Sequence, residues 1–338
     1  MVFTFQPFYF KVMAEKNNIS RILCLALLAA LVLLIAPFFG TKVILPRMLF
    51  EGGTDSSIFF KMRVPRVLLA FVAGASLSLG GMVFQSLFRN SLATPYTLGV
   101  SGGAALGMAV ALRLGVSMTL LGQGIGGISA FIGALIVTLL VFGVCRLRRQ
   151  RRPEDMLLAG VAVSILCSNA IILLQYIGDE SRLFQTMRWM MGSVAVTGYN
   201  QIITLLAFCI VPVIVILIHA REIDLIQFGS DFAKSRGVNA AHCQNMLFVA
   251  VSFMVAAVVS VCGPIGFIGM ICPHICRRIY GSTHAVLAPT SLLFGGAFLV
   301  LCDAIGRCAA APTELPVGII TAILGCPFFL WLLYRNSR

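Results

Sequence analysis

Two cysteines and a histidine within five residues of one another are the side chains of this sequence best suited to bind a metal. Cys272 and Cys276 flank His274 in the sequence CPHIC. Cysteines four residues apart share one face of a helix and could hold zinc or copper, but His274 lies off that face and no fourth ligand is nearby. We therefore interpret the three as small, polarisable packing residues and predict no metal site, with metal binding as an open alternative.

The acidic residues offer little for proton or sodium transfer. None of the 12 Asp and Glu residues falls inside the apolar segments described below, where ion-driven carriers usually place their relay groups. Asp303 stands at the end of one segment with Arg307 four residues later, so the two form either an ion pair, which we favour, or part of a proton relay. The sequence also lacks the phosphate-binding pattern GxxxxGK[ST]. We predict a chain that is not an enzyme and holds no cofactor of its own.

These residues belong to a very apolar chain that must lie in a membrane. Of its 338 residues, 59% are hydrophobic and 11% are charged, and the mean hydropathy is +0.99. A soluble domain carries about 25% charged residues, so a soluble enzyme is excluded. About 20 apolar residues cross a bilayer, and nine segments are close to that length. They are residues 22–39, 67–88, 95–112, 124–145, 156–177, 202–218, 246–262, 285–302 and 315–334.

A tenth apolar segment, residues 264–276, is short, and the distribution of basic residues decides whether it crosses. With ten crossings and the N-terminus in the cytoplasm, 16 of the 25 Lys and Arg residues lie inside and nine outside. Without this crossing the division becomes 13 against 12, and the bias that membrane proteins show is lost. We therefore predict one all-α transmembrane domain over residues 1–338, with ten helices and both termini cytoplasmic. The net charge of +13 serves this orientation, and we predict no nucleic-acid partner.

Residues 221–245 form a cytoplasmic stretch that is too apolar for an idle linker. Ser230 or Asp231 could cap a short helix that runs to Arg236, Gly237 could supply a left-handed turn, and Asn239 could cap the next helix. We interpret this stretch as a docking element for another protein and call it the coupling element.

Several motifs, in order from about residue 60 to the C-terminus, resemble the FecCD/BtuC-type permease subunits of type II ABC importers. The motifs are RVPRVLLA (63–70), GGMVFQ (80–85), RNSLATPYTLGVSGGA (89–104), LAGVA (158–162), WMMGS (189–193), SRGV (235–238), GPIGFIG (263–269), PHI (273–275) and ELPVGI (314–319). The resemblance implies a ten-helix permease that works as a homodimer in the bacterial inner membrane. Its partners would be two cytoplasmic ABC ATPase subunits, which bind ATP and Mg, and a periplasmic or lipid-anchored solute-binding protein.

The resemblance also implies roles for particular residues at the two membrane surfaces. Arg63, Arg66 and Arg307 would receive carboxylates of the binding protein on the outer side, although interfacial arginines can also simply anchor helix ends. On the inner side, the coupling element would rest in a groove of the ATPase. The residues implied in that contact are Phe228, Asp231, Phe232, Arg236, Gly237 and Val238.

A gate and a pathway complete the implied sites. Asn90, Ser91 and Leu92 would form an inner gate, where Ser91 replaces the proline usual in the family and leaves the backbone freer. The fifth apolar segment would line the pathway through Gly160, Ser164, Cys167 and Ser168, unless that face packs against neighbouring helices.

We predict a permease that imports a metal chelate by alternating access. The resemblance places an iron-siderophore first among cargoes, followed by haem and cobalamin, with an oxyanion such as molybdate also open. The alternative class is a secondary transporter or channel that works alone. An integral-membrane enzyme would need a cluster of His, Asp or Cys at one depth, and the sequence shows none.

Overall fold

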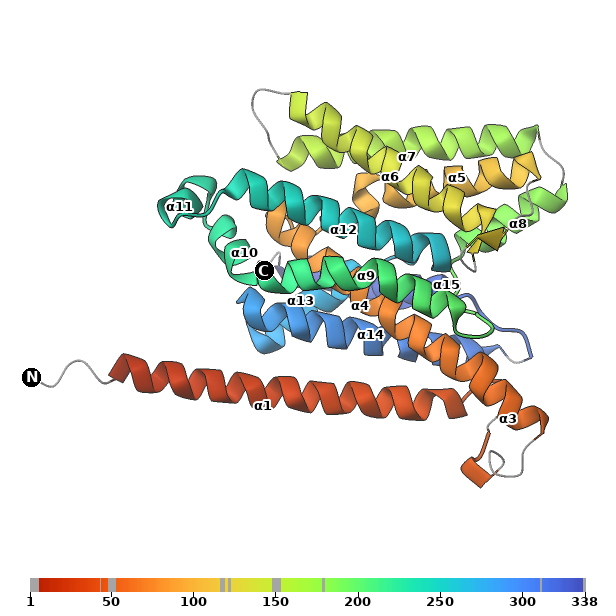
Figure 1. The fold of residues 1–338 in the computed structure, drawn as a ribbon, viewed down its shortest axis with the longest axis horizontal. Coiled ribbons are helices and arrows are strands. Elements are labelled where there is room, and N and C mark those ends of the chain that lie inside the picture. The colour runs from red at the N-terminus through yellow and green to blue at the C-terminus, as the bar shows by residue number, and fades with distance from the viewer. Residues whose placement is uncertain are drawn as a thin grey trace, which may run out of the picture.

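A computed structural model describes most of the chain. The described residues are 6–42, 44–47, 53–115, 119–120, 123–147, 153–177, 180–310 and 312–336. Within them the protein is an all-α bundle of elongated helices that run roughly along one axis (Figure 1). A pair of two-residue strands, β1 (Thr119–Leu120) and β2 (Gln123–Gly124), joins two of the helices.

Ten helical segments occupy the ten predicted apolar segments, which confirms the predicted fold class. Seven are long and apolar enough to cross a membrane: α1 (Gln6–Ile35), the run from α3 (Thr54–Ile58) through a π-helical turn (Phe59–Arg63) to α4 (Val64–Leu87), α6 (Ile125–Leu147), α7 (Pro153–Tyr176), α9 (Asn200–Ile218), α12 (Ala240–Cys262) and α14 (His284–Ala309). Three fall outside that group: α5 (Val100–Leu114), α13 (Ile268–Tyr280) and α15 (Val317–Asn336), whose apolar stretch Val317–Leu332 is shorter. The short tenth segment is therefore a helix, and it lies four residues further along the chain than we predicted.

Helix α4 forms the centre of the bundle. It buries 19 of its 24 residues and packs against α9, α12, α13 and α14. Two pairs of glycines allow the closest approaches, because a Cβ on Gly81 would overlap the carbonyl oxygen of Gly269, and one on Gly74 would overlap that of Gly295. Such close helix contacts through small residues take the place of a hydrophobic driving force inside a membrane.

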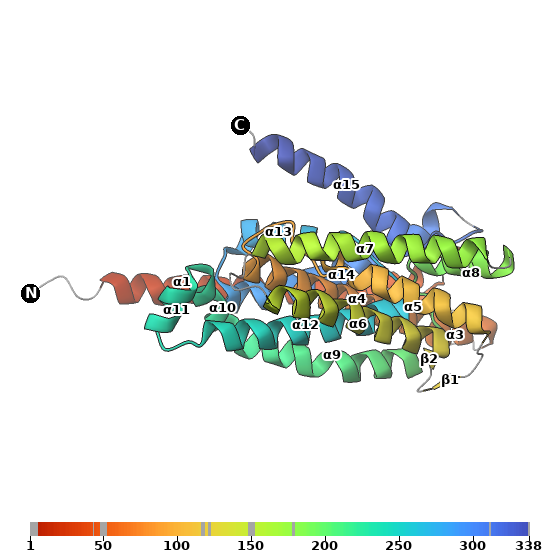
Figure 2. The same cartoon turned by 90° about the horizontal axis from the view of Figure 1, so that it is seen from above.

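The two ends of the bundle carry different structures. Short helices α10 (Ala220–Gln227) and α11 (Ser230–Ser235) lie at one end, which we call the α10 end. The start of α4 and the end of α14 lie at the other end (Figure 1). We call it the arginine end, because these two helix ends carry Arg63, Arg66 and Arg307. Helix α1 begins and α15 ends at the α10 end, as an even number of crossings requires. Figure 2 shows that α15 diverges from the bundle, on the side opposite α9.

Candidate coupling, gate and docking sites

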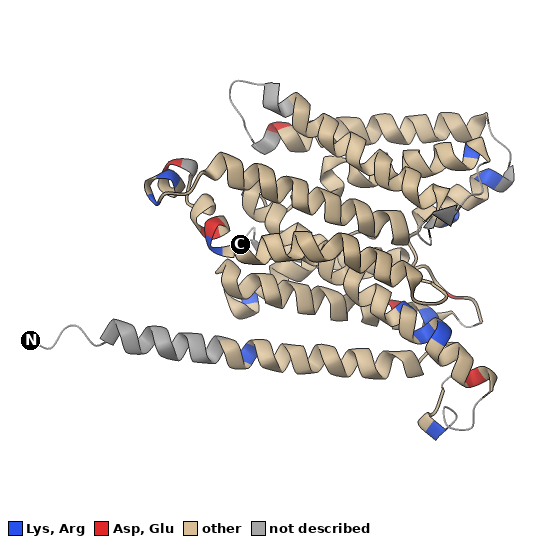
Figure 3. Ribbon diagram, viewed as in Figure 1, with Lys and Arg blue, Asp and Glu red and all other residues tan. Residues whose placement is uncertain are grey.

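Charged side chains gather at the two ends of the bundle, while the middles of the helices are almost free of them (Figure 3). At membrane depth a charge is costly, so the ends are where polar contacts to other proteins can form. The structure therefore places the predicted docking and coupling residues at opposite ends, with the predicted pathway residues of α7 between them.

Helix α10 is fixed to the bundle by one apolar face. Ala220, Ile223 and Ile226 are buried where α10 packs against α4, α12 and α14, and their three-residue spacing places them on one helix face. The first half of the coupling element is thus part of the bundle, and a force applied to it reaches three long helices directly.

The second half of the coupling element presents aromatic side chains to the outside. Phe228 is 77% exposed and Phe232 is 41% exposed, and their ring centroids lie 5.7 Å apart in an edge-to-face arrangement. Arg236 places its guanidinium 5.6 Å from the centre of the Phe232 ring. Two adjacent exposed aromatic rings at a helix turn are typical of a protein interface. We call Phe228 and Phe232 the aromatic ridge.

The turns of the coupling element agree with the sequence prediction in part. Gly237 has φ +81°, the left-handed conformation predicted for it, and the Asn239 side chain accepts a hydrogen bond from the His242 amide, 3.2 Å away, as the predicted cap of α12. The predicted N-cap of α11 was wrong, because Gly229 occupies the cap position, with φ 130° and no side-chain cap. The predicted C-terminal end agrees, since the helix runs to Ser235 and Arg236 is its C-cap. Asp231 is exposed beside Lys234, at 3.9 Å, and Val238 is half-buried.

The predicted gate is a tight turn that follows α4. The Asn90 side chain accepts a hydrogen bond from the Leu92 amide at 2.9 Å, and the Asn90 carbonyl accepts one from the Ala93 amide at 3.1 Å. These local bonds order the backbone at Ser91, where the family's proline is missing. Ser91 and Leu92 are exposed, so the turn is free to meet another surface, and its role as a gate stays a prediction.

Arg89 connects this turn to α10, a link that the sequence analysis missed. Its Nη2 donates a hydrogen bond to the carbonyl oxygen of Ile226 at 2.9 Å, at the C-terminal end of α10. Arg89 also has φ 48°, a conformation uncommon outside glycine. Its only sequence signal was its place directly before Asn90 in the longest family motif.

At the arginine end, Arg66 belongs to a buried ion network. Asp303 has an arginine on each side. Arg66 donates a hydrogen bond from Nε to its Oδ1 at 2.9 Å, with Nη2 at 2.8 Å, and Arg307 forms an ion pair with it, Nε to Oδ2, at 3.0 Å. Glu314, just before α15, pairs with the Nη1 of Arg66. This geometry supports a structural ion pair for Asp303 and Arg307, the interpretation we favoured over a proton relay.

Arg63 and Arg307 are both turned inward. Arg63 donates to the carbonyl oxygens of Pro37 and Phe38 at 3.2 and 3.1 Å, and to that of Lys42. Arg307 donates to the carbonyls of Ala36 and Phe39 at 3.2 and 2.6 Å. Both therefore bind the chain that follows α1, which favours the open alternative of anchoring. Their role in docking stays a prediction, and Arg66, linked to the exposed Glu314, is the arginine nearest the surface.

The remaining candidates lie between the two ends. Cys272 and Cys276 are fully buried in the apolar core, and no group of three His, Cys, Asp or Glu side chains that could hold a metal occurs in the part of the chain that the structure describes. On α7, Gly160 lies against the carbonyl of Thr97, and Cys167 is buried beside Gly102 of α5. Ser164 donates to the Gly160 carbonyl at 2.8 Å, whereas Ser168 is exposed. The packing alternative is thus favoured for Gly160 and Cys167, and pathway lining stays a prediction.

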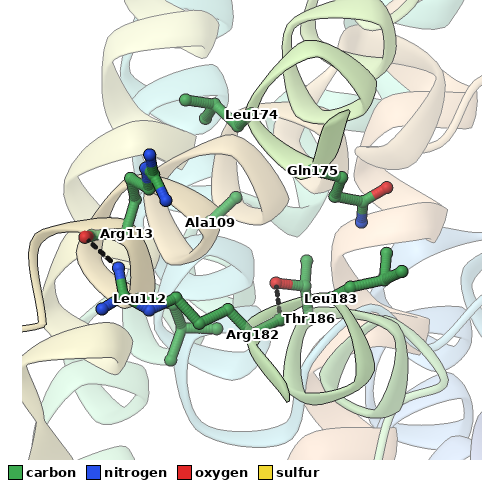
Figure 4. Close-up of a pocket in the computed structure, with 8 residues that line it drawn as sticks. All are labelled: Ala109, Leu112, Arg113, Leu174, Gln175, Arg182, Leu183 and Thr186. Carbon is green, nitrogen blue, oxygen red and sulfur yellow. Dashed lines mark hydrogen bonds between the residues drawn. The ribbon is translucent and has the colours of Figure 1, made fainter. Parts of the chain in front are cut away.

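The structure has a large apolar groove and a small pocket. A groove of about 830 Å³ between α6, α9 and α12 is lined almost wholly by apolar side chains, including Phe208, Val211 and Phe253. A much smaller pocket of about 20 Å³ lies between α5, α7 and α8 (Glu180–Met190), where Arg182 donates to the carbonyl of Arg113 at 2.6 Å (Figure 4). The small pocket has room for about one water molecule, so it is not a cargo site.

Comparisons with known proteins agree with this arrangement. The FecCD transport family matches residues 13–335. The vitamin B12 import system permease protein BtuC of Escherichia coli O6:H1 is 37% identical over 325 residues, which cover 96% of this chain and 98% of that protein. The hemin transport system permease protein HmuU of Yersinia pestis is 36% identical over 296 residues, which cover 86% of this chain and 88% of that protein.

A solved structure is similar to this protein in both fold and sequence. It is described as an inward-facing conformation of a metal-chelate type ABC transporter, and it superposes with a TM-score of 0.84 at 29% identity over 94% of this chain and 99% of that one. Sequence, fold and the end-to-end division of the charged residues thus agree, and this chain belongs to the FecCD transport family of ABC transporter permeases.

Proposed function

We propose that this permease forms the translocation pathway of an ABC importer for a metal chelate, driven by ATP hydrolysis on a separate subunit. The observation that carries the proposal is the coupling element. One face of it, Ile223 and Ile226, is buried in the bundle, while the aromatic ridge is exposed at the same end. This arrangement suits an element that receives movement from a soluble partner and passes it to the membrane helices.

The cargo class follows from the relatives. Vitamin B12 and hemin, which the two named permeases transport, are both metal chelates, and the structural relative is described as a metal-chelate transporter. We propose the same class here, with an iron-siderophore, haem or cobalamin as the candidates. A polar chelate would not pass through the apolar groove between α6, α9 and α12, so that groove would face lipid.

A second copy of the chain would complete the pathway. Helix α15 leaves the bundle, and α7 exposes large apolar side chains such as Leu158, Leu166 and Ile172. Both helices lie on the same side in Figure 2, away from the apolar groove along α9. We propose that two copies meet on this side and enclose the pathway, that two ATPase subunits bind at the α10 end, and that a solute-binding protein docks at the arginine end. The α10 end and both termini would then be cytoplasmic, in the bacterial inner membrane.

The experiment is reconstitution of the permease with its ATPase and binding protein in proteoliposomes. The binding protein is first purified, and the molecule it retains is identified by mass spectrometry. The retained molecule should be a metal chelate. Its uptake should require the ATPase, and ATP on the side of the membrane where the α10 end and the ATPase lie. Uptake that proceeds with an ion gradient and no ATPase would instead support a secondary transporter.

A further inference from the structure

A buried chain of three polar side chains joins the coupling element to two long helices. His284 is the first residue of α14 and is 0% exposed. Its Nδ1 lies 2.5 Å from the Oδ1 of Asp224 on α10, and its Nε2 lies 2.6 Å from the Oγ of Ser86 on α4. The three residues come from three helices and lie 60 and 198 positions apart in sequence, so the chain exists only in the folded protein.

The donors and acceptors along this chain are matched. The Asp224 carboxylate only accepts, so the Nδ1 of His284 carries a proton and donates to it. The Ser86 hydroxyl then either donates to the Nε2 or accepts from it while donating to the carbonyl of Met82, 2.9 Å away. Hydrogen bonds of this length with a charged acceptor are among the stronger ones in proteins. The side chain of His284 is satisfied at both nitrogens, which explains how it tolerates complete burial.

Asp224 also holds the beginning of α14. The backbone amide of His284 lies 3.0 and 3.2 Å from the two carboxylate oxygens of Asp224. The first amides of a helix lack partners within the helix, and Thr283, at the cap position, makes no side-chain cap. A carboxylate supplied by α10 therefore takes the place of the N-cap, where its charge also suits the positive end of the helix dipole.

Ser–His–Asp chains can be catalytic, but this one is closed to substrate. Ser86 is 1% exposed and His284 is fully buried. A nucleophilic serine must reach a substrate carbonyl, and this hydroxyl is packed between α4 and α14. The chain can position helices, and it cannot act on a molecule from outside.

A second hydrogen bond links α10 to the end of α4, at Arg89, three residues after Ser86. Arg89 donates to the carbonyl of Ile226, so α10 is tied to the end of α4 through Ser86 on one side and through Arg89 on the other. The predicted gate, Asn90 to Leu92, begins directly after Arg89. A displacement of α10 would therefore move the end of α4 and the gate turn with it.

Helix α14, which begins at His284, also connects these hydrogen-bonded residues to the arginine end. Asp303, which pairs with Arg66 at the arginine end, lies on α14 19 residues after His284. At a rise of about 1.5 Å per residue this separation is about 28 Å. Helix α14 is thus held at one end by Asp224 of the coupling element and at the other by Arg66, with one continuous helix between them.

We propose that Asp224, His284 and Ser86 act as positioning residues that pass the displacement of the coupling element to α14 and α4. This inference rests on the proposed function, because it assumes that an ATPase moves α10. It adds the residues through which that movement enters the membrane helices, and it makes α14 the rod that connects the ATPase end to the arginine end.

The test uses the whole complex of permease, ATPase and binding protein in proteoliposomes, with ATP hydrolysis measured with and without the binding protein. The variants are Asp224→Ala, the conservative Asp224→Asn, His284→Gln and Ser86→Ala. Asp155→Asn is the matched control, since Asp155 is a half-buried carboxylate on α7, outside the coupling element. His242→Gln is the second control, because His242 is an exposed histidine in the first turn of α12.

We expect Asp224→Ala and His284→Gln to bind the ATPase normally but to lose stimulation by the binding protein by about tenfold or more, the size that follows from losing a charge-assisted hydrogen bond. Asp224→Asn keeps an acceptor oxygen and should recover most of the stimulation. The double variant Asp224→Ala/His284→Gln should be no worse than the worse single one, since the two act through one contact. Both controls should behave as the unchanged protein.

Two results separate failure of this inference from failure of the proposed function. Full stimulation in Asp224→Ala, or losses in the double variant that equal the product of the single losses, would overturn the inference alone. Failure of the unchanged permease to bind an ATPase would overturn the proposed function. Asp224 is 27% exposed, so its variants are expected to fold even if the replacement of fully buried His284 lowers the yield.

Discussion

The aromatic ridge gives a quantitative prediction for the contact with the ATPase. Phe228 is 77% exposed, and a phenylalanine side chain buries about 200 Å² when it is fully covered, so about 150 Å² is available for a partner to cover. At about 25 cal/mol per Å² this area corresponds to about 4 kcal/mol if the partner covers all of it, and about 2 kcal/mol if it covers half. Since 1.4 kcal/mol is a factor of ten, Phe228→Ala should raise the Kd for the ATPase by about 30- to 700-fold.

The assay is a titration of detergent-purified permease with the ATPase subunit. Phe228 contacts the ring of Phe232 and lies outside the apolar core, so Phe228→Ala should leave the Tm of the permease nearly unchanged. Phe184→Ala is the matched control, because Phe184 is 68% exposed on α8, far from α10. A Kd for Phe228→Ala within threefold of that for Phe184→Ala would refute the reasoning.

Three further predictions test other parts of the account. Gly237→Val places a β-branched residue at φ +81°, so it should lower the free energy of unfolding by about 1–2 kcal/mol and reduce stimulated ATP hydrolysis. Gly237→Asn should have a mild effect, and equal effects of the two variants in the hydrolysis assay would show that the turn is unimportant. Arg63→Ala should lower the Tm only, because three carbonyl groups lose their donor. Arg66→Ala should lower the Tm, because Asp303 loses a partner, and should also slow association with the binding protein in surface plasmon resonance; slowed association in Arg63→Ala alone would assign docking to Arg63. Asp303→Asn should destabilise the fold by about 3–5 kcal/mol in thermal unfolding, since Arg66 and Arg307 lose their shared carboxylate. Lost transport at unchanged Tm would point to a proton relay.

The sequence predicted local features of the coupling element because those features depend on neighbouring residues. A glycine after a short polar helix and an asparagine before an apolar one define a left-handed turn and a cap, and both are present at Gly237 and Asn239. The cap of α11 was missed because Gly229 offers no side-chain signal, whereas Ser230 and Asp231 next to it do. Only the backbone conformation of Gly229 identifies the true boundary.

The orientation of the arginines could not be predicted in the same way. The carbonyl groups that bind Arg63 belong to residues at least 21 positions away, and those that bind Arg307 are about 270 positions away. A positive charge near a membrane surface is equally compatible with docking and with anchoring, and only the fold brings the chain after α1 beside both side chains. The chain from Asp224 through His284 to Ser86 has the same character, since none of its members lies near another in sequence.

The number of helices followed from composition, and their faces did not. Apolar length predicted nine helical segments, and the distribution of basic residues added the short α13 as a tenth. The cost of exposing backbone to lipid leaves little choice but helix for such segments. Helix α7 is apolar all round, so its sequence has no periodicity that separates a face toward the pathway from a face toward α5. Only the tertiary structure therefore shows that Gly160 packs against Thr97.

The central claim is that this permease moves its cargo only when a separate ATPase drives it. The most direct test is uptake, into proteoliposomes, of the molecule that its binding protein retains, measured for the permease alone under proton and sodium gradients and for the complete complex with ATP. The account predicts no uphill accumulation by the permease alone and accumulation by the complex that stops when ATP hydrolysis is blocked. Uphill accumulation by the permease alone would contradict it.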